Sequence, residues 1–158
     1  MKICKPVILL IFLLILVYSC TKNSTSTINV YSFQTKDYEK LRLDIKKNGD
    51  KILYQYTSKT DSTKNLELTF NFRKNFLATK QDTFYSFRKT YTTKDYEYFY
   101  YQQINAQSHV RTLVFEEDYG LLLSSGYGAD FLFVKDSLSK IEMEDIFKEL
   151  ILELNKID

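Results

Sequence analysis

Apolar side chains recur at every second position through most of this chain, and this period of two constrains the fold more than any other feature. In residues 41–45 (LRLDI), leucine and isoleucine alternate with Arg42 and Asp44, and residues 66–72 (LELTFNF) repeat the pattern. Such alternation is typical of β-strands that bury one face. Further strand-like segments follow up to residue 135, and Asn48-Gly49 is a strong hairpin signal between two of them. The spacing predicts a meander of about eight or nine antiparallel strands.

The period changes once, near the C-terminus, where residues 138–157 place apolar side chains at helical spacing. Ser139 and Glu142 form a predicted capping box, and Leu138 with Met143 fits a hydrophobic staple. The apolar stripe of this helix needs a partner, and a face of the sheet is the natural candidate. We therefore expect an α+β domain. It would consist of a curved antiparallel sheet, either half-closed or closed into a barrel, with the C-terminal helix packed on it.

The N-terminus has the layout of a secretory signal peptide. Lys2 and Lys5 precede an apolar run from residue 7 to residue 18, and a small residue, Ser19, precedes Cys20. The run is well short of the ~20 apolar residues that a membrane-spanning helix needs. Residues 1–19 are therefore predicted to be a signal peptide that is removed.

Residues 17–20 (VYSC) resemble the lipobox of bacterial lipoproteins, in which an aliphatic residue, a variable residue and a small residue precede a cysteine. The resemblance implies cleavage before Cys20, attachment of a diacylglyceryl group to its sulfur and acylation of its amine. Two or more acyl chains give a stable membrane anchor. The resemblance also implies a place in the bacterial cell envelope. Thr21 follows the cysteine, where an aspartate would resemble an inner-membrane retention signal, so the outer membrane is favoured.

The rest of the chain is predicted to be one tethered domain. Residues 20–27 (CTKNSTST) are expected to form the lipidated cysteine and a flexible tether, and residues 28–158 are expected to form a single domain. Loss of Lys2 and Lys5 with the signal peptide cancels the formal net charge of +2. The mature chain therefore has no overall basic character that would favour nucleic acid. It also keeps a single cysteine and cannot form an intramolecular disulfide.

Few residues suggest catalysis or metal binding. His109 is the single histidine, and the sequence contains no glycine-rich phosphate loop. Residues 116–118 (EED) bring three carboxylates to a predicted hairpin. They could hold a hard cation such as Ca²⁺ or supply acids to a hydrolase, but a solvated acidic turn is the favoured interpretation. We expect no cofactor, no metal site and no catalytic residue, and a hydrolase is the least favoured alternative.

Two neighbouring segments are candidates for interaction. Residues 73–94 interleave cationic and aromatic side chains, which could contact anionic lipid headgroups, although a solvated loop or a protected strand edge is favoured. Residues 95–103 (DYEYFYYQQ) have aromatic rings on both faces of one strand. The favoured interpretation packs one face on the core and the other under the helix, while a tyrosine-rich interaction surface is the alternative.

Two functions are predicted from these features, neither of them enzymatic. The leading one is a membrane-tethered module that binds a protein partner in the envelope. Its candidate binding residues are Arg88, Lys89, Tyr96, Tyr98, Phe99, Tyr100 and Tyr101. The second is a carrier or sensor of a lipid or another apolar ligand, held between sheet and helix in a cavity lined by Tyr98, Phe99 and Leu123.

Overall fold

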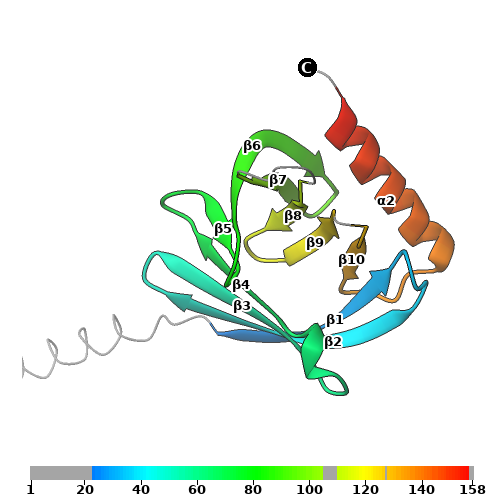
Figure 1. Ribbon diagram of the computed structural model, residues 1–158, viewed down its shortest axis with the longest axis horizontal. Helices are drawn as coiled ribbons and strands as arrows, with labels where there is room; N and C mark the ends of the chain where they lie inside the picture. Colours follow the sequence, from blue (N-terminus) through cyan, green and yellow to red (C-terminus); the bar gives the residue numbers. More distant parts are fainter. Residues whose placement is uncertain (1–22, 105–109, 127, 157–158) are drawn as a thin grey trace, which may run out of the picture.

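The computed structural model describes residues 23–104, 110–126 and 128–156, with the backbone alone at residue 88. Within these ranges the chain forms ten strands, a short 3₁₀ helix and one α-helix (Figure 1). The strands are β1 (Ser24–Ser32), β2 (Tyr38–Asn48), β3 (Lys51–Ser58), β4 (Leu66–Asn71), β5 (Phe76–Ala78), β6 (Thr83–Thr92), β7 (Glu97–Gln103), β8 (Thr112–Glu116), β9 (Gly120–Ser125) and β10 (Phe131–Val134). The 3₁₀ helix η1 spans Ser62–Lys64 and the α-helix α2 spans Lys140–Asn155.

Every strand pairs antiparallel with the strand that follows it, and β10 pairs with β1, so the sheet is a closed barrel. Val30 of β1 faces Phe133 of β10 across the seam. The structure confirms the antiparallel meander, its curvature and the single C-terminal helix. It has ten strands rather than eight or nine, because the three-residue strand β5 carries too little alternation to be recognised in the sequence.

Residues 24–27, predicted to be part of a flexible tether, are instead the first residues of β1. Ser24 lies opposite Ile45 of β2, and the Thr25 hydroxyl donates a hydrogen bond of 2.6 Å to Asp44. Backbone pairing with the long strand β2 therefore extends the sheet over small polar residues. Their composition had suggested a flexible segment.

The barrel interior is filled by the inward-facing residues of the alternating pattern. Phe115 is at the centre of this core, and its ring lies 5.1 Å from that of Tyr54, 5.2 Å from that of Phe70 and 6.0 Å from that of Tyr101, measured between centroids. Tyr54 and Phe115 are at most 1 % exposed. Each such ring contributes roughly 1.5–3 kcal/mol of hydrophobic stabilisation.

One end of the barrel is sealed by the turn between β8 and β9, and we call it the closed end. The Tyr54 hydroxyl of β3 donates a hydrogen bond of 2.6 Å to the Glu117 carbonyl, and the Leu121 amide donates one of 2.8 Å to the Tyr56 hydroxyl. Gly120 makes this approach possible: its φ is +92°, and a Cβ there would lie 2.5 Å from the Tyr56 hydroxyl. Strands that are not neighbours in the sheet are thus joined across the barrel.

Helix α2 packs on the outer face of the barrel beside β6 and β10 (Figure 1). Its capping box forms as predicted, with Ser139 and Glu142 each bonding the other's backbone amide. The Tyr100 hydroxyl of β7 donates 2.9 Å to the Leu150 carbonyl. Among the described residues, no helix has the length and apolar character needed to cross a membrane.

Candidate ligand-binding site at the open end of the barrel

The barrel holds a cavity of about 590 Å³ at the end opposite the β8–β9 turn, which we call the mouth cavity. It lies between the β1–β2 connection, η1 and the first residues of β10. Its lining residues are Val30, Ser32, Gln34, Thr35, Asp37, Tyr38, Glu39, Leu41, Thr63, Lys64, Leu66, Arg111, Ser124, Phe131 and Phe133. The volume is in the range of small-molecule sites in proteins.

The floor of the mouth cavity is apolar. Val30, Leu41 and Phe133 belong to the barrel core and are at most 8 % exposed, and the half-buried Leu66 and Phe131 complete the floor above them. Apolar surface left in contact with water costs about 25 cal/mol per Å², so covering this floor with an apolar group is favourable. The polar side chains lie around it, at the rim.

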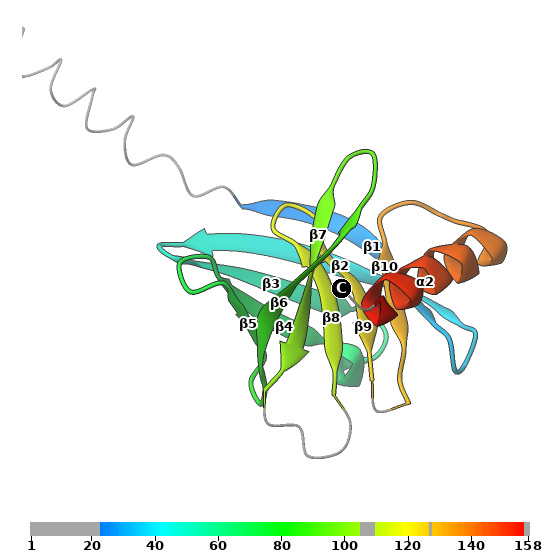
Figure 2. The same cartoon turned by 90° about the horizontal axis from the view of Figure 1, so that it is seen from above.

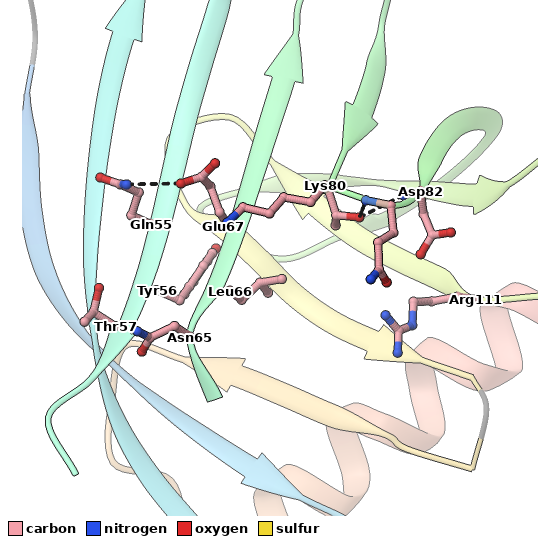
Figure 3. Close-up of a pocket in the computed structure, with 11 residues that line it drawn as sticks. Gln55, Tyr56, Thr57, Asn65, Leu66, Glu67, Lys80, Asp82 and Arg111 are labelled. Carbon is pink, nitrogen blue, oxygen red and sulfur yellow. Dashed lines mark hydrogen bonds between the residues drawn. The ribbon is translucent and has the colours of Figure 1, made fainter. Parts of the chain in front are cut away.

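A second cavity of about 460 Å³, the side cavity, adjoins the first through Leu66 and Arg111, which line both (Figure 3). It lies where β4 extends beyond β5, because the β4–β5 pairing begins only at Thr69 and Ala78. Its walls are mostly polar, and the Gln55 amide donates 3.2 Å to Glu67 on its outer side. Figure 3 shows the Arg111 guanidinium extending into this space.

The rim next to η1 is held by a network around one half-buried carboxylate. Glu39 accepts a hydrogen bond of 2.6 Å from the Ser58 hydroxyl and forms an ion pair of 2.7 Å with Lys64. Burial raises the pKa of Glu39, but the hydrogen bonds from Lys64 and Ser58 outweigh burial and leave this pKa below its ordinary value. The Asn65 side chain accepts from the Ser58 amide at 2.9 Å and fixes the far side of η1. This side of the rim is therefore held in place by contacts within the protein.

Of the aromatic residues predicted for partner binding, three are buried in the structure. Tyr98 and Tyr100 lie under α2, and Tyr101 is in the barrel core; each is at most 2 % exposed. Tyr96 is half-buried against Tyr119, while Phe99 is 38 % exposed. Apart from the exposed Phe99, the rings of this strand separate between helix and core, in the way that the favoured interpretation of residues 95–103 predicts. Their role in binding a partner stays a prediction.

Lys89, also predicted for partner binding, faces the last turn of α2. Its ammonium donates 3.0 Å to the Leu154 carbonyl and also donates to the Lys156 carbonyl, and both are among the carbonyls left without intrahelical partners at a helix end. A cation here also complements the negative end of the helix dipole. The Arg88 side chain is outside the described part of the structure. Lys89 is thus engaged in fixing the helix to β6.

The space between sheet and helix, predicted to hold an apolar ligand, is mostly packed. A cavity of about 150 Å³ remains there, and Tyr98 lines it. Leu123 is fully buried and lies in the same cluster beneath the helix, whereas Phe99 is on the other face of its strand. The two larger cavities are at the barrel mouth.

In the acidic turn at residues 116–118, a carboxylate accepts hydrogen bonds from backbone amides of the same hairpin. One carboxylate oxygen of Glu116 accepts hydrogen bonds from the Asp118 and Tyr119 amides, at 2.9 and 2.7 Å. Among the described residues, no group of three histidine, cysteine or acidic side chains is placed to hold a metal ion. His109 lies outside the described residues.

Sequence reasoning missed the mouth residues, Arg111 and Leu66 above all. A weak signal was present: the inward positions of the alternating pattern change from leucine and aromatic residues to serine as β3 and β9 approach this end, at Ser58 and Ser124. A polar residue at a core position of a strand marks either a strand end or a cavity. The sequence alone does not distinguish them.

Comparison with known proteins gave no match to a protein-family model, to a curated protein or to a solved structure. The geometry of the cavities is therefore the basis for inferring function.

Proposed function

We propose that this protein is a non-enzymatic lipoprotein of the bacterial envelope that binds a small amphipathic molecule in the mouth cavity, with Cys20 as its membrane anchor and the outer membrane as its place. One observation carries the ligand-binding part: an apolar floor is open to a preformed polar rim, in a barrel whose other half is tightly packed. A packed barrel with no binding role would gain stability by filling this space.

The two zones of the cavity define the chemistry of the ligand. An alkyl or aromatic group would cover Leu41 and Phe133 on the floor. A hydrogen-bond-accepting group would lie near Arg111, whose planar guanidinium presents fixed donors at the junction of the two cavities. Small antiparallel barrels of other families also hold single small ligands, which is support from fold analogy alone.

The protein-partner function predicted from the sequence has less support than ligand binding. Tyr98, Tyr100 and Tyr101 are buried, so they offer no continuous ring surface to a partner. A role as ligand carrier keeps the second of the two predicted functions and changes the place of the ligand, from the helix interface to the barrel mouth.

A neutral fluorescent probe, N-phenyl-1-naphthylamine, tests the proposal. The chain from Thr21 onward should bind it saturably with a rise in fluorescence. Ser124→Trp places a large ring into the mouth cavity from a half-buried position and should weaken binding about tenfold or more. Ser137→Trp adds the same ring at an exposed serine outside the cavity and should bind like the parent.

Circular dichroism must show the same strand content in both variants, so that a loss of binding is not a loss of fold. Absence of saturable binding by the parent, or equal affinity of the Ser124→Trp variant and the parent, would overturn the proposal. Equal weakening by both tryptophans would place the probe elsewhere on the barrel.

A further inference from the structure

The closed end of the barrel carries a group of cationic side chains on two adjacent turns and on the strand ends beside them. The β2–β3 and β4–β5 turns contact each other, since the Phe72 amide donates 3.3 Å to the Asp50 carbonyl. We call the surface they form the basic face. Its exposed cationic residues are Lys46, Lys47, Lys51, Arg73 and Lys74.

An aromatic ring is exposed among these cations. Phe72 is 38 % exposed at the start of the β4–β5 turn, and the Lys47 ammonium lies 5.2 Å from its ring centroid. A ring beside lysine side chains suits the boundary between lipid headgroups and acyl chains, where the ring can insert while the ammonium groups meet phosphates. Charged side chains alone would keep this face soluble, so the exposed Phe72 ring indicates a further role.

The acidic turn at residues 116–118 borders the basic face and, together with Asp50, neutralises part of its charge. Asp50 pairs with Arg73 at 2.9 Å, and Glu117 pairs with Lys47 at 3.4 Å. In the described part of the chain, Lys51 and Lys74 are in no ion pair. Their charges are therefore available to an anionic partner.

The chain enters the barrel at this same end. β1 begins at Ser24, opposite Ile45 and thus next to Lys46 in β2. In Figure 2 the start of β1 and the β2–β3 turn lie on one side of the barrel, and η1 and the β1–β2 connection lie on the other. Only residues 21–23 separate Ser24 from Cys20, a reach of roughly 14 Å at most. A membrane anchor at Cys20 would hold the basic face near the bilayer.

We propose that the basic face docks on a bilayer that contains anionic phospholipids, so that the barrel mouth points away from the membrane. The docking is carried by charge and by Phe72, and it does not depend on a ligand in the mouth. The orientation rests on the proposed anchor at Cys20. A mouth turned away from the bilayer exchanges its ligand with the aqueous compartment or a carrier there.

Vesicle co-sedimentation tests the docking without the anchor. All ten strands and α2 lie within residues 24–155, and every strand is paired on both sides there, so a chain that begins at Thr21 keeps the complete fold. This chain should bind vesicles of equal parts phosphatidylglycerol and phosphatidylcholine at low ionic strength. It should bind pure phosphatidylcholine weakly, and added salt should release it.

Matched charge removals locate the docking surface. The triple variant Lys46→Gln, Lys51→Gln, Lys74→Gln should lower the partition coefficient about tenfold or more. The triple variant Lys36→Gln, Lys59→Gln, Lys80→Gln removes the same charge from exposed lysines on open-end connections and should change the coefficient less than twofold.

Phe72→Ser should weaken binding severalfold with no change in charge. The docking proposal is overturned if the parent ignores anionic vesicles, binds neutral ones equally well, or loses binding equally in both triple variants. Probe binding by the same variants is a separate readout, and it should be unchanged when the basic face is altered. Failure of docking and failure of ligand binding are therefore distinguishable.

Discussion

The two ends of this barrel share the same strands but differ in what fills them. At the closed end, aromatic rings surround Phe115, and the Tyr54 and Tyr56 hydroxyls are bonded to the backbone of the β8–β9 hairpin. At the open end, serine and Arg111 take the inward positions, and two cavities remain. Ring packing is therefore concentrated at the closed end, and unfilled space is found at the open end.

The connections differ in the same way as the interiors. Those at the closed end are short, and two residues join β2 to β3. Most connections at the open end are longer, and one of them contains η1, although the β5–β6 connection has only four residues. Loops on a rigid scaffold are where binding residues concentrate, because their sequence can change at little cost to the fold.

The largest effect is expected from alkaline pH. It should destabilise the closed end most, because buried tyrosines fill that end. Burial raises the pKa of Tyr54 and Tyr56 far above 10, and burial raises that of Tyr101 to about 12. Their contribution to stability is fully present below the unfolded pKa near 10 and is lost as pH rises through the folded pKa. Each tyrosine then removes roughly 1.4 kcal/mol per pH unit. The tyrosinate absorbance of these buried tyrosines and the far-ultraviolet circular dichroism should change together in one cooperative unfolding above pH 10. Ionisation of these tyrosines with the strands intact would show that the closed end is open to solvent.

Truncation of Phe115 should destabilise the protein more than truncation of a ring at the mouth. Phe115→Ala leaves a cavity among three rings and should cost about 3–5 kcal/mol in the free energy of unfolding. Phe131→Ala removes a half-buried ring that already borders a cavity, and it should cost about 1 kcal/mol. Urea denaturation measures both. Equal costs would mean that the open end is packed as tightly as the closed one.

Gly120→Ala should disrupt the seal at the closed end. The new Cβ would occupy a left-handed backbone conformation and collide with the Tyr56 hydroxyl, so we expect a loss of about 2–4 kcal/mol. Gly128→Ala, near the mouth, has φ +69° but open space around it, and it should cost about 1 kcal/mol. The difference between the two urea midpoints measures the cost of the collision with Tyr56, because both alanines have the same kind of unfavourable backbone conformation. If the two alanines were equally tolerated, the seal would not depend on close contact.

The smallest effect is expected at the rim, from Glu39→Gln. Because the pKa of Glu39 is lowered in the folded protein, its carboxylate contributes stability above its ordinary pKa of 4.5, and this is lost as pH falls through the folded value. The urea midpoint of the parent should therefore fall more on acidification than that of the variant. Lys64 is largely exposed, so the difference should be small. Identical pH profiles would show that this ion pair does not stabilise the rim.

Local patterns were sufficient to predict much of the fold. Gly49 has φ +56° in the turn that Asn48-Gly49 indicated, and the Ser139–Glu142 capping box begins α2. Both are decided by residues a few positions apart. Closure of the sheet is different, because it depends on β1 meeting β10, whose sequences contain no mark of each other.

The candidate site was harder to predict than the fold. A cavity is space that side chains do not fill. Leu66 and Arg111 border both cavities because β4 extends beyond β5 at the open end. The aromatic composition of the strand at residues 97–103 suggests an interaction surface. Tyr98 and Tyr100 instead pack under α2, and Tyr101 packs in the barrel core.

Pairing of β1 with β10 also sets the order in which the chain can complete its fold. The first strand to leave a ribosome or a translocation channel has β2 as a neighbour early, but its other edge waits for nearly the whole chain. Pairing over such a separation closes slowly, since chain entropy must be lost before the contacts form. Until then the edge of β1 is an open template for other strands. A chain whose barrel cannot close before its last strand arrives stays open until then, and its final closing step removes both free edges at once.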